Sequence, residues 1–400
     1  MPKTIKQKTK KTAITKTPYY SCCIGDLAKG CRLCVKGQKT VIFITGHCAS
    51  NCYFCPISDK KKNKDVVYIN EWPTSGLKDC FKEIRLCSSK GVGITGGDPL
   101  ARTERTCSYI KRLKQKFGKS FHIHLYTPLI LVDEKKLDML HKAGLDEIRF
   151  HPDLDSRLFW HRLKLAKKPK YKWDIGVEMP VIPNKEKQII NLINFIKDDI
   201  GFLNLNELEI SDTNANKLVE LGYTAKDSFS YAVKNSDALA KKILKYCESK
   251  IKSGEFNFSV HYCTTTLKDK IQLAERIKRR AKSIKKDYDV MDKEGLLTRG
   301  AIYLLDLAPG FGYAGMIEEI NRYPRKKEKV ILRLDKIKDS IKNRFDIPSK
   351  LIDVDHDKLR ILIAPWILGQ IYDKINLKVK SAIVKEYPTW DKLIIELEFL

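Results

Sequence analysis

Strand-like and helix-like segments alternate along most of this 400-residue chain, and this alternation is the feature that most restricts its fold. From Thr40 to about Cys263, short apolar runs are separated by amphipathic stretches such as 102–116 and 133–142. The strand candidates are 40–45, 91–95, 120–126, 146–151, 174–181, 206–211 and 256–262. Because strands that alternate with helices form a parallel sheet with helices outside it, the sequence predicts an α/β barrel or part of one.

Three cysteines follow the first of these strands on one short loop. Cys48, Cys52 and Cys55 have the spacing C-x3-C-x2-C and come directly after the apolar run 41–45. Three thiolates on a tight loop can hold three irons of a cubic iron–sulfur cluster and leave the fourth iron open. A structural zinc site usually adds a ligand pair at a second spacing, and none follows within the next 40 residues. The spacing favours a cluster, with zinc as the alternative.

A second motif extends the cysteine loop into a family resemblance. Phe54 precedes the last cysteine, and Gly93-Ile94-Thr95-Gly96-Gly97-Asp98-Pro99 resembles the Gly-Gly-Glu-Pro element of radical S-adenosylmethionine (SAM) enzymes. Asp98 stands where that family has Glu, a small departure because the position matters through its backbone geometry. The resemblance covers roughly residues 20–285, and the nearest group is the uncharacterised archaeal one related to pyruvate formate-lyase activating enzyme. It implies a partial (β/α)6-type radical SAM barrel with a C-terminal α+β extension.

The resemblance also implies the cofactors and the reaction. It implies that Cys48, Cys52 and Cys55 bind a [4Fe–4S] cluster whose open iron takes the amine and carboxylate of SAM. A one-electron donor of ferredoxin or flavodoxin type then reduces the cluster, a carbon–sulfur bond of SAM breaks, and a 5′-deoxyadenosyl radical abstracts hydrogen from a substrate. By the same analogy Phe54 serves the adenine, and the Gly96–Pro99 turn, through Gly96 and Gly97, serves the methionyl amine.

Polar residues near the ends of later strands are further candidates for SAM binding. His124 and Tyr126 alternate on one side of the third strand, and Arg149 lies near the end of the fourth. The working face of a parallel barrel lies at the carboxyl ends of its strands, so we expect these three side chains to contact SAM. The same argument extends to Glu178, Glu207, Glu209, His261 and Cys263. For each residue the alternative is a hydrogen-bonded polar group of the core.

A second group of cysteines precedes the first strand. Cys31-x2-Cys34, with Cys22 or Cys23 nearby, could hold a second cluster or a metal ion, although no fourth ligand is visible. The alternative is free thiols that pack as small apolar side chains. Twelve cysteines in a chain that we expect to be cytoplasmic indicate metal or redox chemistry rather than disulfides.

The formal charge of +27 raises the question of an anionic partner. Six of the first 17 residues are lysines with no acid among them, and such a field attracts nucleic acid. The alternative is a solvated, ion-pair-rich surface. The sequence therefore predicts a radical SAM enzyme acting on RNA or a protein. A non-catalytic iron–sulfur or zinc protein that binds nucleic acid is the alternative.

Composition changes divide the chain into four parts. We expect a disordered basic tail over 1–17, a cysteine-containing lead-in over 18–38, the barrel over 39–289 and an α+β domain over 290–400. In the last part, Gly310–Gly315 fits the dinucleotide pattern G-x-G-x-x-G, but Pro309 opens the loop and Pro324 cuts the following helix short. The longest apolar run, 361–369, is too short to span a membrane, so we expect a cytoplasmic protein with no membrane partner.

Overall fold

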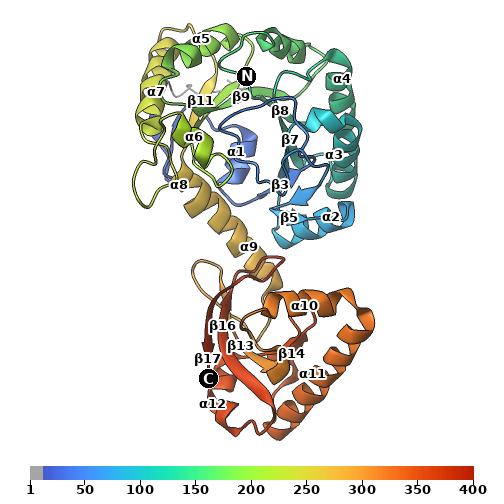
Figure 1. The fold of residues 1–400 in the computed structure, drawn as a ribbon. Coiled ribbons are helices and arrows are strands. Elements are labelled where there is room, and N and C mark those ends of the chain that lie inside the picture. The colour runs from blue at the N-terminus through green and yellow to red at the C-terminus, as the bar shows by residue number, and fades with distance from the viewer. Residues whose placement is uncertain (1–11) are drawn as a thin grey trace, which may run out of the picture. The chain divides into compact units, whose positions relative to one another are not determined.

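The computed structural model describes residues 12–400 and forms two compact units, one ending at Arg276 and the other running from Ile277 to Leu400 (Figure 1). Most of the expected basic tail, residues 1–11, lies outside the described part. The prediction that disorder extends to residue 17 is wrong for its last residues, which form a strand. There β1 (Thr15–Lys16) pairs antiparallel with β2 (Cys22–Ile24), and the amide of Ile14 donates to Glu248 Oε1 at 2.8 Å.

Seven parallel strands follow one another in both sequence and space in the first unit. They are β3 (Lys39–Phe43), β6 (Gly91–Thr95), β7 (His122–Thr127), β8 (Glu147–Phe150), β9 (Asp174–Val181), β10 (Phe202–Glu207) and β11 (Ser259–Cys263). At the two ends of this series, β3 pairs antiparallel with β4 (Tyr68–Ile69), which leads to β5 (Trp72–Pro73), and β11 pairs with β2. No strand pair in the described chain joins β3 to β11, so the barrel is partial, as predicted.

Most of the helices between the strands lie around the outside of this ring, whereas the short α6 (Ala215–Glu220) is drawn within its outline (Figure 1). The other helices are α2 (Leu77–Leu86), α3 (Thr103–Phe117), α4 (Glu134–Ala143), α5 (Glu186–Ile196) and α7 (Ser236–Lys252). In α4 the Asp133 carboxylate accepts the amide of Lys136 at 2.8 Å, and Gly144 ends the helix with φ 98°. Both helices predicted from apolar spacing, α3 and α4, form within a residue of the predicted bounds.

One predicted strand is wrong by four residues. The sixth strand was expected over 206–211, whereas β10 covers Phe202–Glu207. After Glu207 the chain leaves the parallel sheet and pairs with a nearby segment instead. The amide of Val233 donates to the carbonyl of Leu208 at 2.8 Å, and Glu209 forms a β-bridge with Ala232. The apolar alternation continues through this local pairing, which explains the error.

A short helix, α1 (Lys29–Cys34), lies within the ring of strands (Figure 1). It packs against β3, β6 and β7, and the amide of Gly30 donates to Glu147 Oε2 at 3.1 Å. A Cβ atom on Gly30 would lie 2.5 Å from Arg149 Nη2 and 2.6 Å from His124 Nδ1. Only glycine therefore lets this helix approach the polar interior.

The strongly basic stretch after β11 forms one uninterrupted helical run over residues 265–284, in three parts. It begins as α8 (Thr265–Leu267), continues as a π-helical segment (Lys268–Leu273) and ends as α9 (Ala274–Ile284). Lys268 and Gln272, both in the π-helical segment, line the cavity described below. π-helical turns are frequent at functional sites because they redirect side chains.

The second unit is an antiparallel sheet with helices, an α+β arrangement. Its strands are β12 (Val290–Met291), β13 (Leu297–Leu304), β14 (Ile352–Asp355), β15 (Arg360–Ile363), β16 (Val379–Glu386) and β17 (Ile394–Phe399). Its helices are α10 (Tyr313–Arg322), α11 (Pro324–Arg344) and α12 (Pro365–Ile371). Every strand pair of this sheet is antiparallel, so the glycine pattern at 310–315 does not sit in the parallel βαβ unit that dinucleotide binding requires. None of the helices formed by residues 12–400 is long and apolar enough to cross a bilayer.

We expect the charge on Asp355 to stabilise this second unit. Asp355 is 5% exposed and pairs with Arg360 and Lys392, which lower its pKa from 3.8 to about 2 despite burial. Because the folded pKa is below the unfolded one, the stabilisation is present above pH 3.8 and is lost as pH falls through about 2. At 1.36 kcal/mol per pKa unit it amounts to about 2 kcal/mol at pH 7.

The measurement is a urea titration at pH 7 and at pH 2.5, read by pulsed hydrogen exchange of peptides from β14 and β15. Asp355→Asn is expected to lower the unfolding free energy by about 2 kcal/mol at pH 7 and by much less at pH 2.5. Asp357→Asn is the matched control, since Asp357 also pairs with Lys392 but is 72% exposed at its side chain. An equal loss in both variants would contradict the prediction.

Candidate active site

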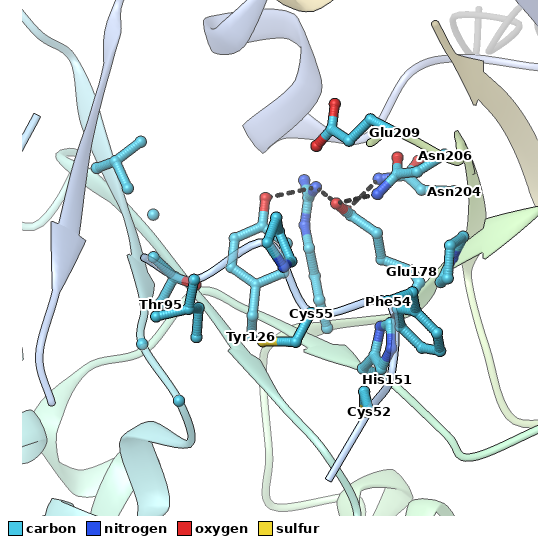
Figure 2. A pocket seen from close by; sticks show the side chains of 18 of the residues that line it. Cys52, Phe54, Cys55, Thr95, Tyr126, His151, Glu178, Asn204, Asn206 and Glu209 are labelled. Atoms are coloured by element: carbon cyan, nitrogen blue, oxygen red, sulfur yellow. Dashed lines mark hydrogen bonds and ion pairs between the residues drawn. The ribbon is translucent and has the colours of Figure 1, made fainter. Parts of the chain in front are cut away.

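A cavity of about 640 Å³ opens at the carboxyl ends of the parallel strands (Figure 2). Its wall includes the loop after β3, the turn after β6 and residues of β7 to β11. Among the predicted site residues, the cavity is lined by Cys48, Cys52, Cys55, Phe54, Gly96, Gly97, Tyr126 and Arg149.

The three cysteines of the loop after β3 are half-buried and all face this cavity. Burial and the neighbouring thiols Cys55 and Cys48 raise the pKa of Cys52 to about 12, and burial also raises the pKa of Cys48. Three thiolates this close repel one another, so ionising them together requires a cation. An iron cluster supplies that cation because its irons bind thiolates.

Three thiols on one loop are the kind of donors that a cubic cluster takes. Among residues 12–400 no group of three or more His, Cys, Asp or Glu side chains converges on one ion site. In a cubic cluster each cysteine binds a different iron, so the sulfurs need not converge. The donor set of this loop fits a cluster.

The glycine turn after β6 packs directly on the cysteine loop. The amide of Gly97 donates to the carbonyl of Thr45 at 2.8 Å, and the amide of Asp98 donates to that of His47 at 2.7 Å. A Cβ atom on Gly97 would lie 2.4 Å from the His47 oxygen, and one on Gly96 would lie 2.5 Å from the Thr45 oxygen. Both glycines are required for this close approach, which brings the two motifs together at one end of the cavity.

Asp98 and Pro99 support the turn and do not line the cavity. The fully buried Asp98 carboxylate accepts the amide of Leu100 at 2.9 Å and the hydroxyl of Thr127 at 2.8 Å, so it caps the 3₁₀ helix Pro99–Arg102. Burial raises the pKa of Asp98 to about 6. Pro99 occupies the first turn of that helix, where its missing amide hydrogen costs nothing.

An ion-pair cluster around Asp65 fixes the two ends of the cysteine loop. Asp65 accepts the hydroxyl of Thr45 at 2.9 Å, Arg105 Nη1 at 2.6 Å and Arg102 Nε at 2.9 Å. Hydrogen bonds from Arg105 and Arg102 hold the pKa of Asp65 well below its ordinary value. The amide of Gly46 donates to the carbonyl of Lys64 at 2.8 Å, so both ends of the loop are fixed.

Phe54 lies against His151 on one side of the cavity (Figure 2). The two ring centroids are 5.8 Å apart, and the carbonyl of Phe54 accepts Asn214 Nδ2 at 3.0 Å. His151 Nδ1 lies 2.9 Å from the carbonyl of Glu178. The two rings are inclined to each other by 51°, so an aromatic base can stack on the face of one ring at a time.

A polar network around Arg149 forms another part of the wall, and Figure 2 draws its Tyr126, Glu178, Asn204 and Asn206 side chains. The Arg149 guanidinium donates to Glu178 at 2.7 Å, to Glu147 at 2.5 Å and to the Tyr126 hydroxyl at 3.3 Å. Glu178 also accepts Asn204 Nδ2 at 2.8 Å and Asn206 Nδ2 at 3.0 Å. Although burial opposes the charge, Arg149 lowers the pKa of Glu178 to about 2 and holds the pKa of Glu147 well below its ordinary value.

His124 does not reach the cavity. Its Nε2 lies 3.2 Å from Lys39 Nζ in the barrel interior, and a Cβ atom on Gly30 would lie 2.6 Å from its Nδ1. Burial and Lys39 hold the pKa of His124 well below its ordinary value. Its surroundings match the alternative noted for it, a hydrogen-bonded polar residue of the core.

The cysteines that precede the first strand lie on two different elements. Cys23 lies in β2, and Cys31 and Cys34 lie on α1 facing the cavity. The Cys31 sulfur accepts Arg149 Nη2 at 3.4 Å and Asn204 Nδ2 at 3.3 Å. Although burial opposes ionisation, Arg149 lowers the pKa of Cys31 to about 7.

Several lining residues were not singled out from the sequence. They are Lys39, Asn204, Asn206, Lys268 and Gln272. The alternation in Phe202-Leu-Asn-Leu-Asn-Glu would have identified the two asparagines had the strand been placed correctly. Lys39 precedes an apolar run, where a lysine usually faces solvent.

Comparison with known sequences identifies two matched regions. Residues 42–178 match the family described as the radical SAM superfamily, and residues 329–398 match a domain of unknown function, DUF8061. A protein of Methanocaldococcus jannaschii, named as a "putative glycyl-radical enzyme activating enzyme", is 38% identical over 384 residues. That alignment covers 92% of each chain.

Solved structures give weaker matches. Methylornithine synthase aligns over 52% of this chain and 62% of its own, with 13% identity and a TM-score of 0.34. A radical SAM methyltransferase from Kitasatospora setae, with cobalamin and a [4Fe–4S] cluster bound, aligns over 61% of this chain and 52% of its own. Its identity is 11% and its TM-score 0.34. The relationship therefore rests on the sequence matches.

Proposed function

Because this chain belongs to the radical SAM superfamily and is a radical SAM enzyme, we propose that Cys48, Cys52 and Cys55 bind its [4Fe–4S] cluster and that the adjoining cavity binds SAM. The observation that carries the proposal is the packing of the Gly96–Gly97 turn on the cysteine loop at one end of a single cavity. When bound, the reduced cluster and SAM supply a 5′-deoxyadenosyl radical that takes a hydrogen atom from the substrate.

The protein's own groups orient the cofactors and exclude water. The Gly96–Gly97 turn packs closely on the cysteine loop, and the ring of Phe54 offers a face on which the adenine can stack. Tyr126, Arg149 and Glu178 offer hydrogen-bonding groups already fixed by their neighbours, so little side-chain entropy is lost on binding.

We propose that the substrate is a glycine residue of a partner protein. The support is the name of the 38% identical relative, which refers to activation of a glycyl-radical enzyme, together with the near-complete coverage of both chains. RNA remains the second candidate because of the charge of +27. Enzymes of this superfamily need a one-electron reductant, and we propose a ferredoxin- or flavodoxin-type donor.

The test is anaerobic reconstitution with iron and sulfide, followed by SAM and dithionite. The expected result is release of 5′-deoxyadenosine by the full-length protein. With a co-purified partner, the expected signal is a glycyl radical in electron paramagnetic resonance. Release without that signal, together with bound RNA whose affinity falls steeply with salt, would favour the second candidate. Absence of 5′-deoxyadenosine from protein with a full iron content would refute the enzyme assignment.

A further inference from the structure

Two thiols of the short helix α1 line the cavity and take no part in the function proposed above. Cys31 and Cys34 are both free, and they lie three residues apart on one face of the helix. Helix geometry places two such Cα atoms about 5 Å apart. That separation lies within the range of about 4.4–6.8 Å that disulfides span. Since Cys34 is the last residue of α1, the small shift that brings the two sulfurs together involves only the end of the helix.

The surroundings of Cys31 favour its thiolate. Arg149 Nη2 and Asn204 Nδ2 donate to its sulfur at 3.4 Å and 3.3 Å. Although burial opposes ionisation, Arg149 and His261 lower the pKa of Cys31 to about 7. The thiolate is the form of cysteine that attacks a disulfide, and a thiol whose pKa is near the ambient pH attacks most efficiently. Cys31 is therefore suited to be an attacking thiol.

Cys34 has the opposite character, which suits a thiol that acts second. Burial raises its pKa and the negative charge of the Cys31 thiolate raises it further, whereas Lys39 acts against both. Cys34 therefore stays protonated while Cys31 is ionised. Once Cys31 has formed a mixed disulfide its charge is gone, so Cys34 ionises more readily at the step in which it has to attack.

A third thiol of the cavity lacks these features. Cys263 lies on β11, a different element from α1. Burial holds the pKa of Cys263 well above its ordinary range, and its sulfur accepts Gln272 Nε2 at 3.7 Å. Only the α1 pair combines an ionised thiol with a protonated one at the spacing that a disulfide requires, so Cys263 serves as a comparison within the same cavity.

We propose that Cys31 and Cys34 form a redox-active dithiol that reduces a small-molecule disulfide entering the cavity. The Cys31 thiolate attacks one sulfur of that disulfide, forms a mixed disulfide and releases the other half as a thiolate. Cys34 gives its proton to the released thiolate and attacks the Cys31 sulfur, and the second half leaves as a thiolate. Two electrons pass from the protein to the small molecule, whose sulfur–sulfur bond breaks as one forms between Cys31 and Cys34. The exchange uses neither a cluster nor SAM, so it is independent of the function proposed above.

The test follows this exchange in the full-length, reconstituted protein under anaerobic conditions after the reductant has been removed. The probe is 2-hydroxyethyl disulfide, and the remaining thiols are blocked before digestion with trypsin. Cleavage after Lys29, Arg32 and Lys36 places the two cysteines on separate peptides, 30–32 and 33–36. The expected product is these two peptides joined by a disulfide, with both halves of the probe released as 2-mercaptoethanol. Probe attached to Cys31 without joined peptides, or no reaction at either cysteine, would overturn the proposal.

Three single variants separate the roles of the thiols. Cys34→Ser is expected to keep the probe on Cys31 as a stable mixed disulfide, because the second thiol is missing. Cys31→Ser is expected to slow modification of this helix about tenfold or more, because Cys34 remains protonated. Cys263→Ser is the matched control and is expected to form the joined peptides at the rate of wild type. If it abolishes them, or if Cys31→Ser reacts as fast as wild type, the assigned roles are wrong. Melting temperatures check that the variants fold alike, and the mapping of wild type needs no variant.

Metal content distinguishes a dithiol from a metal site at the same two cysteines. Before the probe is added, wild type and Cys31→Ser/Cys34→Ser are expected to contain equal amounts of iron and of zinc. A loss of either metal in the double variant would assign these cysteines to a metal site and refute the dithiol. Release of 5′-deoxyadenosine is scored separately, so failure of the proposed function is distinguishable from failure of the dithiol.

Discussion

Replacing Cys48, Cys52 and Cys55 together by alanine is expected to abolish iron binding at the loop after β3 and, with it, all cleavage of SAM. The loop offers three thiols to the cavity, and the glycine turn packed on it has no side chain that could replace a lost sulfur. The cluster carries out the difficult chemistry, so the protein without it has no alternative, slower way to cleave SAM. The measurements are iron content after reconstitution, expected to fall from about four irons per chain to almost none, and 5′-deoxyadenosine release.

Cys34→Ala is the matched control, because Cys34 faces the same cavity from α1 and lies outside the loop. It is expected to keep its iron and its activity. Urea unfolding of both variants before reconstitution checks that they fold alike. If the triple variant retains a full cubane signal, the cluster is held elsewhere, with Cys31 and Cys34 as the first candidates, and the assignment of the loop is wrong.

The barrel and the two ends of the site could be predicted from local pattern. Apolar runs alternating with amphipathic stretches predicted six of the seven parallel strands within about three residues, because a buried parallel strand is apolar along its whole length. The cysteine spacing and the Gly96–Pro99 motif each follow a strand, so both were expected on the same face, and the structure packs them together. Local sequence was sufficient here because each motif lies within a few residues of the strand that positions it.

The floor of the cavity could not be predicted in the same way. Lys39 reaches it from the amino end of β3, and Asn204 from a strand whose bounds were shifted by four residues. Cys31 arrives on α1, a helix placed within the ring by contacts between segments more than 100 residues apart. Which polar side chains of parallel strands meet depends on register, and one sequence does not contain that information.

Arg149→Met is expected to lower the unfolding free energy of the barrel by about 3–5 kcal/mol at pH 7, because it leaves two buried carboxylates without a counter-charge. Arg149 is 2% exposed and pairs with both Glu147 and Glu178. Its charge lowers the pKa of each of these carboxylates against the effect of burial. In wild type both folded pKa values therefore lie below the unfolded value of 4.5, so the stabilisation is present above pH 4.5 and is lost as pH falls toward 2.

Removing the guanidinium reverses the sign of this pH dependence. Burial is then expected to outweigh the hydrogen bonds that Asn204 and Asn206 still donate to Glu178, so the folded pKa values of Glu147 and Glu178 are expected to rise above the unfolded ones and the folded variant to bind more protons than its unfolded chain. Its stability is then expected to increase as pH is lowered from 7 to 5, over a range in which wild type changes little. Urea titrations at pH 7, 6 and 5, with the cluster absent, measure this difference.

Arg112→Met and Arg149→Met/Glu178→Gln complete the experiment. Arg112 is an exposed arginine on α3, and its replacement is expected to change stability by less than about 0.5 kcal/mol at every pH. The double variant removes one of the two carboxylate charges that lose their partner in Arg149→Met. It is therefore expected to be more stable than Arg149→Met at pH 7, and its unfolding free energy is expected to depend less on pH. If Arg149→Met instead loses stability as pH falls from 7 to 5, the network around Arg149 does not hold its carboxylates ionised, and the polar wall of the cavity must be assigned differently.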